Sequence, residues 1–342
     1  MFTIAEEQLI TSLAWFKSRY ALFLGLDPER KADRKSIEDF GEIWIGNFKE
    51  DWTNTFSTLV QKNVLKHISE EYTFTDYGNT VKNEMNAKVP FYKFEYDNFF
   101  YLVKQSKAHS IFCEKVYGLD LSQHGLIDQG ELSILIEMIK KSKSKKIADI
   151  GCGNGKITEY ISEQTQTNCL GIDISSEGIQ NAKERTVANK QLEFAVGNLN
   201  NLQLSGTFDS ILFLDTLYYA DSLKETIIQG IEILAKGGRI FAYFSQWIMD
   251  ESFSDNLKYD KTNLGNVLNE LNLEYSAISL SESGKKHWKR KLEVLMDMKK
   301  DFFDEGNQAL WEFRFRETYR YANWGDDKYA RYLYEIRKQN KQ

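Results

Sequence analysis

Ile147-Ala148-Asp149-Ile150-Gly151-Cys152-Gly153-Asn154-Gly155 is the stretch that decides the fold. It predicts a buried strand that ends in a glycine-rich turn and opens a helix. Because glycine has no side chain, backbone N–H groups at this turn can approach a ligand closely. A second apolar strand, residues 169–172, ends in Asp173, where a carboxylate can accept both hydroxyls of a ribose. The two features predict a nucleoside-binding site at the carboxyl edge of a parallel sheet.

The acid before the first glycine distinguishes this turn from that of a dinucleotide site. Asp149 gives the run the form Asp-x-Gly-x-Gly-x-Gly, whereas dinucleotide sites carry Gly-x-Gly-x-x-Gly. An acid at this place suits a ligand with a cationic amine and not a pyrophosphate. The run resembles motif I of the class I S-adenosylmethionine (SAM) methyltransferases, with Asp173 in their ribose-binding position. The resemblance implies SAM as cofactor and S-adenosylhomocysteine as its product.

Residues 130–245 alternate between strand and helix patterns, which predicts a parallel sheet with right-handed crossovers. We expect a helix over 131–140 before the first strand, and Ser175 or Ser176 as a helix cap. The expected strands are 147–150, 169–172, 192–196, 210–214 and 239–244, and the helices between them are 156–163, 177–187 and 223–234. This order resembles the Rossmann-like α/β core of the same family.

The pattern continues in altered form after residue 248. We expect a helix over 263–271, a strand over 274–280 and a final strand over 329–337. In the family the last two strands form a hairpin, but here about fifty residues separate them, too many for a hairpin loop. The insert, 281–327, is expected to be a helical flap over the carboxyl edge of the sheet. Its aromatic rings either pack the flap onto the core or face substrate; they include Trp288, Phe302, Phe303, Trp311, Phe313, Phe315 and Tyr319.

The N-terminal residues predict three helices, near 5–24, 35–45 and 52–66, followed by a strand-like run over 71–78. This order resembles a winged helix, a module that precedes the core in many small-molecule O-methyltransferases. There it helps the protein dimerise and forms a wall of the substrate pocket. A DNA-binding role would need a basic recognition helix, whereas the candidate has one lysine. The expected domains are therefore 1–118 (N-terminal domain), 119–280 (SAM-binding core), 281–327 (flap) and 328–342 (last strand).

Composition narrows the class of protein. The chain has 342 residues, 42% hydrophobic and 27% charged, and a formal net charge of −6, which disfavours nucleic acid as a partner. It has no apolar run of the ~20 residues that a membrane span needs. Its first residues do not form a secretory signal, and three scattered cysteines form neither a metal site nor a disulfide framework. These features favour the cytoplasm.

The resemblance assigns cofactor contacts to thirteen residues. Asp149 would hold the amine of the methionine moiety, or else serve as a cap or turn carboxylate, while Cys152 is expected to fill space. Asn198 stands where the family usually carries an acid, and its side-chain oxygen can accept a hydrogen bond from the adenine amino group. The full set is Gln123, Asp149, Gly151, Cys152, Gly153, Asn154, Gly155, Asp173, Ile174, Asn198, Leu199, Leu214 and Asp215.

Three residues are candidates for the methyl-transfer step. His124 is a candidate base, although a lone histidine is more often structural. Tyr218 and Tyr219 follow the fourth strand, where they could meet substrate or SAM, or one of them could pack under the next helix. A displacement at an activated methyl requires mainly alignment and a dry site. The sequence therefore predicts a methyltransferase for a small acceptor through nitrogen, oxygen or carbon.

Two other functions remain open at this stage. One is a lipid or cyclopropane-type enzyme, although its cysteine-bearing loop and bicarbonate site are not evident here. The other is a SAM-sensing regulator with a winged-helix effector, which the acidic charge disfavours. A homodimer through the N-terminal helices is also expected.

Overall fold

The computed structural model describes residues 1–24, 31–46 and 52–338, apart from the side chains of 18–24 and 44. Two compact units make up the chain. One contains Met1–Gln105 and Lys299–Arg320, and the other contains Ser106–Met298 and Tyr321–Gln342. We expected the N-terminal domain to end at residue 118, whereas the N-terminal part of the first unit ends at Gln105. The insert, 281–327, is divided between the two units. Residues 339–342 of the expected last segment lie outside the described residues.

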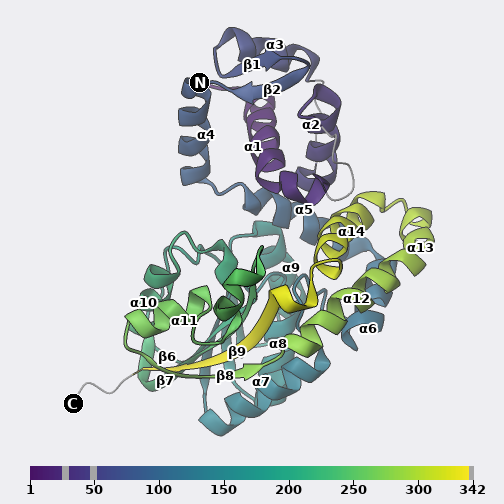
Figure 1. Ribbon diagram of the computed structural model, residues 1–342. Helices are drawn as coiled ribbons and strands as arrows, with labels where there is room; N and C mark the ends of the chain where they lie inside the picture. Colours follow the sequence, from purple (N-terminus) through teal and green to yellow (C-terminus); the bar gives the residue numbers. More distant parts are fainter. Residues whose placement is uncertain (25–30, 47–51, 339–342) are drawn as a thin grey trace. The chain divides into compact units, whose positions relative to one another are not determined.

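A seven-stranded sheet forms the centre of the second unit (Figure 1). Its order is β5-β4-β3-β6-β7-β9-β8, and β9 runs antiparallel to both neighbours, whereas the other neighbouring pairs are parallel. The expected α/β sheet is confirmed. Its strands are β3 (Lys146–Ile150), β4 (Asn168–Asp173), β5 (Leu192–Val196), β6 (Phe208–Leu214), β7 (Leu234–Trp247), β8 (Glu274–Ser279) and β9 (Tyr329–Arg337).

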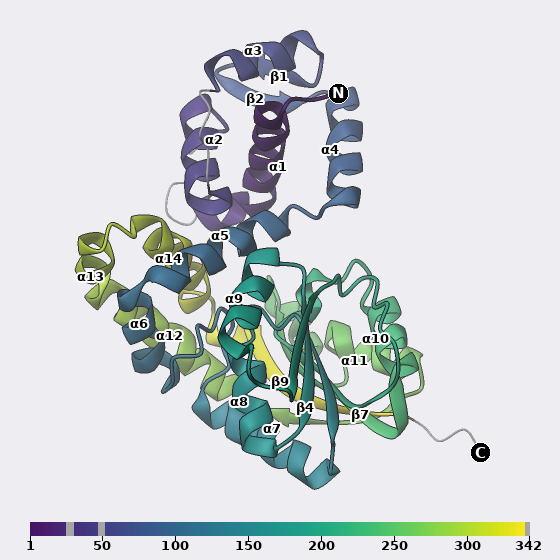
Figure 2. The same ribbon diagram turned by 180° about the vertical axis from the view of Figure 1, so that it is seen from behind.

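Helices cover both faces of this sheet, because its central strands are apolar on both sides. Ile147 faces α7–α9, whereas its neighbour Ala148 faces α10 and α11, as the period of two in a strand requires (Figures 1 and 2). Ser175 caps α9 by accepting the Gly178 N–H. The helices are α6 (Lys107–Tyr117), α7 (Gln129–Ser142), α8 (Lys156–Thr165), α9 (Ser176–Thr186), α10 (Leu223–Glu232), α11 (Asn263–Glu270) and α12 (Ser281–Asp297), with short 3-10 helices η2 (Leu217–Tyr219), η3 (Glu251–Leu257) and η4 (Asp326–Lys328).

The first unit is mainly helical and contains one small hairpin. The third helix is shorter than we predicted. It ends at Gln61, because Asn63 adopts φ +57° and Leu65 begins a strand. Three helices and a strand thus follow in the expected order, but the strand ends at Phe74 instead of residue 78, because Thr75 caps α4, which begins at Asp76. The winged-helix assignment stays a prediction. The elements are α1 (Ile4–Leu24), α2 (Arg34–Phe40), the π-helix η1 (Gly41–Ile45), α3 (Thr53–Gln61), β1 (Leu65–Ile68), β2 (Glu71–Phe74), α4 (Asp76–Lys88), α5 (Tyr92–Gln105), α13 (Lys299–Asp304) and α14 (Gln308–Ala322).

The aromatic residues of the insert separate with the two units. Trp288 on α12 packs against Leu126 and Tyr329 in the second unit. Trp311 and Phe315 on α14 stack on each other in the first unit, with ring centroids 4.5 Å apart. The expected flap is therefore not one compact body.

Among the described residues, every helix is too short or too polar to cross a bilayer.

Candidate functional site

The glycine turn joins β3 to α8 at the carboxyl edge of the sheet. Gly151, Gly153 and Gly155 all have positive φ, at +85°, +59° and +74°. A methyl group on Gly151 would overlap the Thr216 side chain, and one on Gly155 would lie 2.5 Å from the Phe194 ring. The turn therefore needs glycine for its own backbone conformation and packing.

Asp149 lies beneath this turn as the next-to-last residue of β3. Its side chain is almost completely buried, and its Oδ2 accepts a hydrogen bond from the Thr158 hydroxyl at 2.6 Å. Its Oδ1 is buried with no hydrogen-bond partner among the described residues. Burial, with a smaller contribution from the charge of Asp173, raises the pKa of Asp149 to about 7. A buried carboxylate oxygen of this kind is stabilised by a cation, which the donor set of the turn does not supply.

Asp173 ends β4 beside the same turn, as expected. Its Oδ2 accepts the Gly153 N–H and its Oδ1 accepts the Ser175 N–H, both at 2.8 Å. Each carboxylate oxygen can accept more than one hydrogen bond. The two backbone donors thus fix the orientation of this carboxylate at the edge. Ile174, the next residue, is half-buried.

The two residues predicted to contact adenine after β5 have local roles. The Oδ1 of Asn198 accepts the Asn200 N–H at 2.9 Å, so an adenine amino group would share this oxygen with the loop. Leu199 is buried in the core with Ile172 and Leu202. The contacts that we predicted for the two residues stay predictions.

Leu214 and Asp215 close β6 at the same edge. Leu214 is buried, whereas Asp215 adopts φ +60°, an uncommon conformation for a residue other than glycine. Both oxygens of Asp215 accept N–H groups of Arg331, at 2.6 and 2.9 Å. Asp215 is therefore part of a buried ion network.

The two tyrosines after β6 differ in their surroundings. The Tyr218 ring stacks on Phe244 and is 40% exposed, while its hydroxyl accepts the Ser245 N–H at 2.6 Å. Burial of that hydroxyl, together with the charge of Asp215, raises the pKa of Tyr218 well above its usual value. Tyr218 is thus a neutral phenol at pH 7. Tyr219 packs against the core on the α10 side of the sheet.

The segment 118–127 before the core carries Gln123 and His124. Gln123 is buried and its Oε1 accepts the Leu121 N–H, whereas His124 is half-buried. Asp120 forms an ion pair with Lys156 at 3.2 Å, directly after the glycine turn. Burial alone would raise the pKa of Asp120, but hydrogen bonds from Ser110 and Ser122 and the charge of Lys156 lower it. The segment is therefore attached to the turn through an ionised carboxylate.

Cys152 and Asn154 complete the turn. Burial raises the pKa of the Cys152 thiol well above its usual value, which agrees with a space-filling role. The main-chain oxygen of Asn154 accepts a hydrogen bond from Arg185 at 2.8 Å.

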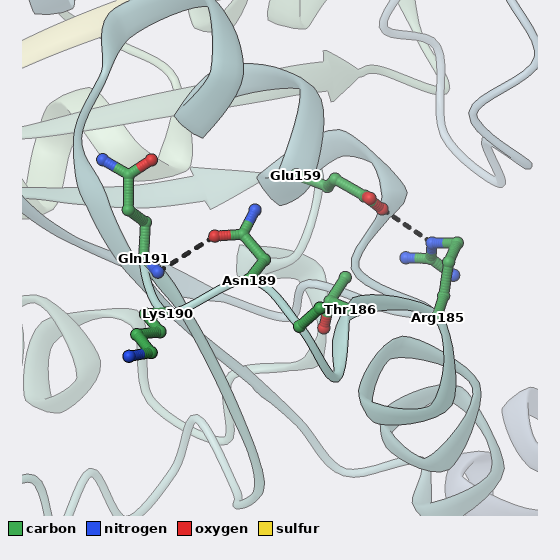
Figure 3. A pocket seen from close by; sticks show the side chains of 7 residues that line it. Glu159, Arg185, Thr186, Asn189, Lys190 and Gln191 are labelled. Atoms are coloured by element: carbon green, nitrogen blue, oxygen red, sulfur yellow. Dashed lines mark hydrogen bonds and ion pairs between the residues drawn. The ribbon is translucent and has the colours of Figure 1, made fainter.

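Arg185 also borders an open surface pocket (Figure 3). Its Nε lies 2.6 Å from Glu159 Oε2, and the other lining residues are Thr186 at the end of α9 and residues 188–191 after it. None of the predicted site residues lines this pocket. We therefore assign the candidate site to the glycine turn and not to this pocket.

Sequence reasoning missed Thr158, Glu131 and Arg331. Arg331 is completely buried and bridges Glu131 and Asp215. One signal was available, because Arg331 stands between Tyr329 and Leu333 on one face of β9, and both of these neighbours are apolar or aromatic and buried. The partners of Arg331 are 200 and 116 residues away in the chain, so the sequence could not name them.

Comparison with known proteins agrees with this geometry. Residues 141–297 match the family model of a methyltransferase domain. The mitochondrial ubiquinone biosynthesis O-methyltransferase of Schizosaccharomyces pombe is 26% identical over 122 residues, 34% of this chain and 44% of that protein. Norajmaline N-methyltransferase of Rauvolfia serpentina is 30% identical over 102 residues, which are 29% of this chain and 35% of that protein. The chain thus spans less than half the length of these curated relatives.

A solved structure supports the fold. Phosphoethanolamine N-methyltransferase 2 of Haemonchus contortus, solved with phosphomonomethylethanolamine and S-adenosylhomocysteine, superposes with a TM-score of 0.54 at 13% identity. The match covers 71% of this chain and 59% of that one. The strand order, the glycine turn with its two edge carboxylates and the family match lead to one conclusion: residues 141–297 form a methyltransferase domain, and its sheet has the Rossmann-like fold of class I SAM-dependent methyltransferases.

Proposed function

We propose that the protein is a SAM-dependent methyltransferase that transfers a methyl group to a small-molecule acceptor through nitrogen, oxygen or carbon. The observation that carries the proposal is Asp149 Oδ1, a buried carboxylate oxygen without a partner among the described residues. It lies beneath a turn of the kind that binds a nucleoside with a cationic amine. The ammonium group of SAM would supply the missing cation and donor.

The residues at the turn fit the other parts of the cofactor. Asp173 would accept the ribose hydroxyls, and the N–H groups of the turn would lie against the amino-acid part. Ile174 and Leu199 would border adenine, with Asn198 as a shared acceptor and Gln123 near the methionine carboxylate. When bound, SAM supplies a methyl group that is already activated. The protein then needs to align the acceptor with that methyl group and exclude water.

The nature of the acceptor decides whether a base is needed. An amine has to arrive deprotonated, whereas a hydroxyl or a carbon acid needs a base. His124 is our candidate for that base. Tyr218 is not, because its raised pKa keeps the phenol protonated. The curated relatives with O- and N-methyltransferase names support both kinds of acceptor. A homodimer and a cytoplasmic location stay predictions from the sequence.

The test is calorimetric titration with SAM and with S-adenosylhomocysteine. We expect both to bind to the wild-type protein, and Asp149→Asn to weaken binding by about tenfold or more, because a charge-assisted contact contributes about 1.5–3 kcal/mol. Asp209→Asn is the matched control, since this carboxylate caps two backbone N–H groups at the opposite edge of the sheet. Failure of the wild-type protein to bind either compound would overturn the proposal.

A further inference from the structure

Arg331 joins three elements of the second unit through its guanidinium group. Its Nε and Nη2 donate to the two carboxylate oxygens of Glu131 on α7, at 3.2 and 3.0 Å. Its Nη1 and Nη2 donate to Asp215 after β6, at 2.6 and 2.9 Å, and Nη1 also donates to Ser245 Oγ on β7 at 3.2 Å. The guanidinium also lies over the Tyr243 ring, 5.1 Å from its centroid. Every N–H group of this buried cation therefore has an acceptor.

The network contains more carboxyl groups than guanidinium groups. Glu131 and Asp215 both bind the single guanidinium of Arg331, all three side chains are nearly inaccessible to water, and burial raises the pKa of Glu131. Burying charged groups is costly, and well-packed apolar residues often stabilise a core as well as a buried ion network does. A second carboxylate is thus not explained by stability alone. It is explained if Asp215 must be held in a defined orientation at the edge of the sheet.

Asp215 contacts the segment 118–127 directly. Its Oδ2 accepts the Leu126 N–H at 3.2 Å, and a methyl group on Gly125 would lie 2.8 Å from that oxygen. The Tyr117 hydroxyl donates to the carbonyl oxygen of Gly125 at 3.0 Å. The carboxylate thus fixes the backbone immediately after His124.

Asp215 also precedes the residue that packs on the glycine turn. Thr216 donates to the Ile150 carbonyl at 2.9 Å, and its side chain fills the space beside Gly151. Asp215 itself has φ +60°, which is costly for a residue with a side chain. Strain of this kind persists where the surroundings impose it, and here the two N–H groups of Arg331 do so.

We propose that Arg331 is a positioning residue. Through Asp215 it holds the end of the segment that carries His124 against the glycine turn, at the place where the cofactor would bind. At the other end of the segment, the ion pair of Asp120 with Lys156 makes a corresponding attachment. The effect on cofactor binding rests on the proposed function, whereas the attachment of the segment does not.

Hydrogen exchange followed by mass spectrometry tests the attachment. In Arg331→Lys, whose ammonium cannot bridge two carboxylates in one plane, exchange of peptide 122–127 should rise about tenfold, since a hydrogen bond to a charged group contributes at least that factor. Peptides from β3 and β4 should be unchanged. Arg337→Lys is the matched control, because Arg337 lies on the same strand and forms an exposed ion pair with Glu274. Equal changes in both variants, or a uniform rise across the sheet, would overturn the proposal.

A second variant disturbs the contact between Asp215 and the segment 118–127 and leaves the charged groups of the network in place. Gly125→Ala inserts a methyl group against Asp215 and should produce the same local rise in exchange. If Arg331→Lys does not fold, this variant decides, and unchanged exchange in it overturns the proposal.

SAM titration gives the functional readout. Both variants should bind SAM at least about fivefold more weakly than the wild-type protein, the lower end of typical coupling between sites. Wild-type affinity in both variants would show that Arg331 does not act on the cofactor site. If the wild-type protein itself did not bind SAM, the proposed function would fail, and the exchange data would still judge the role of Arg331.

Discussion

Asp149 combines two properties that oppose each other in a folded protein. Its burial raises its pKa to about 7, which means that the ligand-free protein pays to ionise it. The same buried oxygen is well placed for a cation, because a low-dielectric site strengthens the attraction between charges. One residue can thus weaken the free protein and strengthen its complex with a cationic ligand.

The affinity for SAM should therefore depend on pH. As pH rises from about 5.5 to 7, the ionised fraction of a carboxyl group with a pKa of about 7 grows by more than tenfold. We expect the association constant for SAM to rise by about tenfold over this range. Calorimetry at several pH values measures it. In Asp149→Asn the affinity should be low and nearly independent of pH across the same range.

The stability of the ligand-free protein should change in the opposite direction. The folded pKa of Asp149 lies above its unfolded value of about 3.9, so the folded state binds the proton more tightly. The stability that this proton contributes is complete below pH 4 and is lost as pH rises through about 7. Denaturant unfolding at pH 5.5 and 8 should thus show a larger loss of stability in the wild-type protein than in Asp149→Asn. Equal losses would contradict the burial of an ionising group at this position.

At the scale of the element, the turn between β3 and α8 depends on both backbone conformation and packing. Gly151→Ala meets a positive φ and the Thr216 side chain together, so we expect a loss of roughly 2–4 kcal/mol in the free energy of unfolding. Gly237→Ala is the matched control, because it has φ +75° but no atom near the added methyl group. It should cost about 1–2 kcal/mol. Denaturant titration of both variants measures the difference, and equal losses would exclude the packing contribution.

The elements of the sheet could be predicted because their signals are local. β5 (Leu192–Val196) and β9 (Tyr329–Arg337) have the expected bounds, since apolar alternation and flanking turn residues mark strand ends. The third helix was predicted five residues too long. A helical pattern over 52–66 continued past Asn63, where the backbone in fact turns with positive φ to start a hairpin. Propensity alone does not locate such a turn.

At the scale of the whole molecule, the two compact units should respond differently to SAM. A ligand that binds only the folded state at a hundredfold excess over its Kd stabilises that state by about 2.7 kcal/mol. The predicted contacts all lie in the second unit, Ser106–Met298 with Tyr321–Gln342. Hydrogen exchange with saturating S-adenosylhomocysteine should therefore slow in this unit and not in Met1–Gln105. Equal slowing in both would mean that the units unfold as one.

The sequence by itself determined the order of strands and helices along the core, the glycine turn and the two carboxylates at the edge of the sheet. Each of these follows from periodicity, turn chemistry and spacing within about thirty residues, which are properties of a local chain segment. The tertiary structure alone decided that Asp149 keeps one oxygen without a partner, that Arg331 holds Asp215, and that residues 299–320 pack with the N-terminal helices. The physical reason is that burial and the pairing of polar groups depend on residues brought together by folding. The two carboxylate partners of Arg331 are more than a hundred positions away in the chain, so no local sequence pattern could identify them.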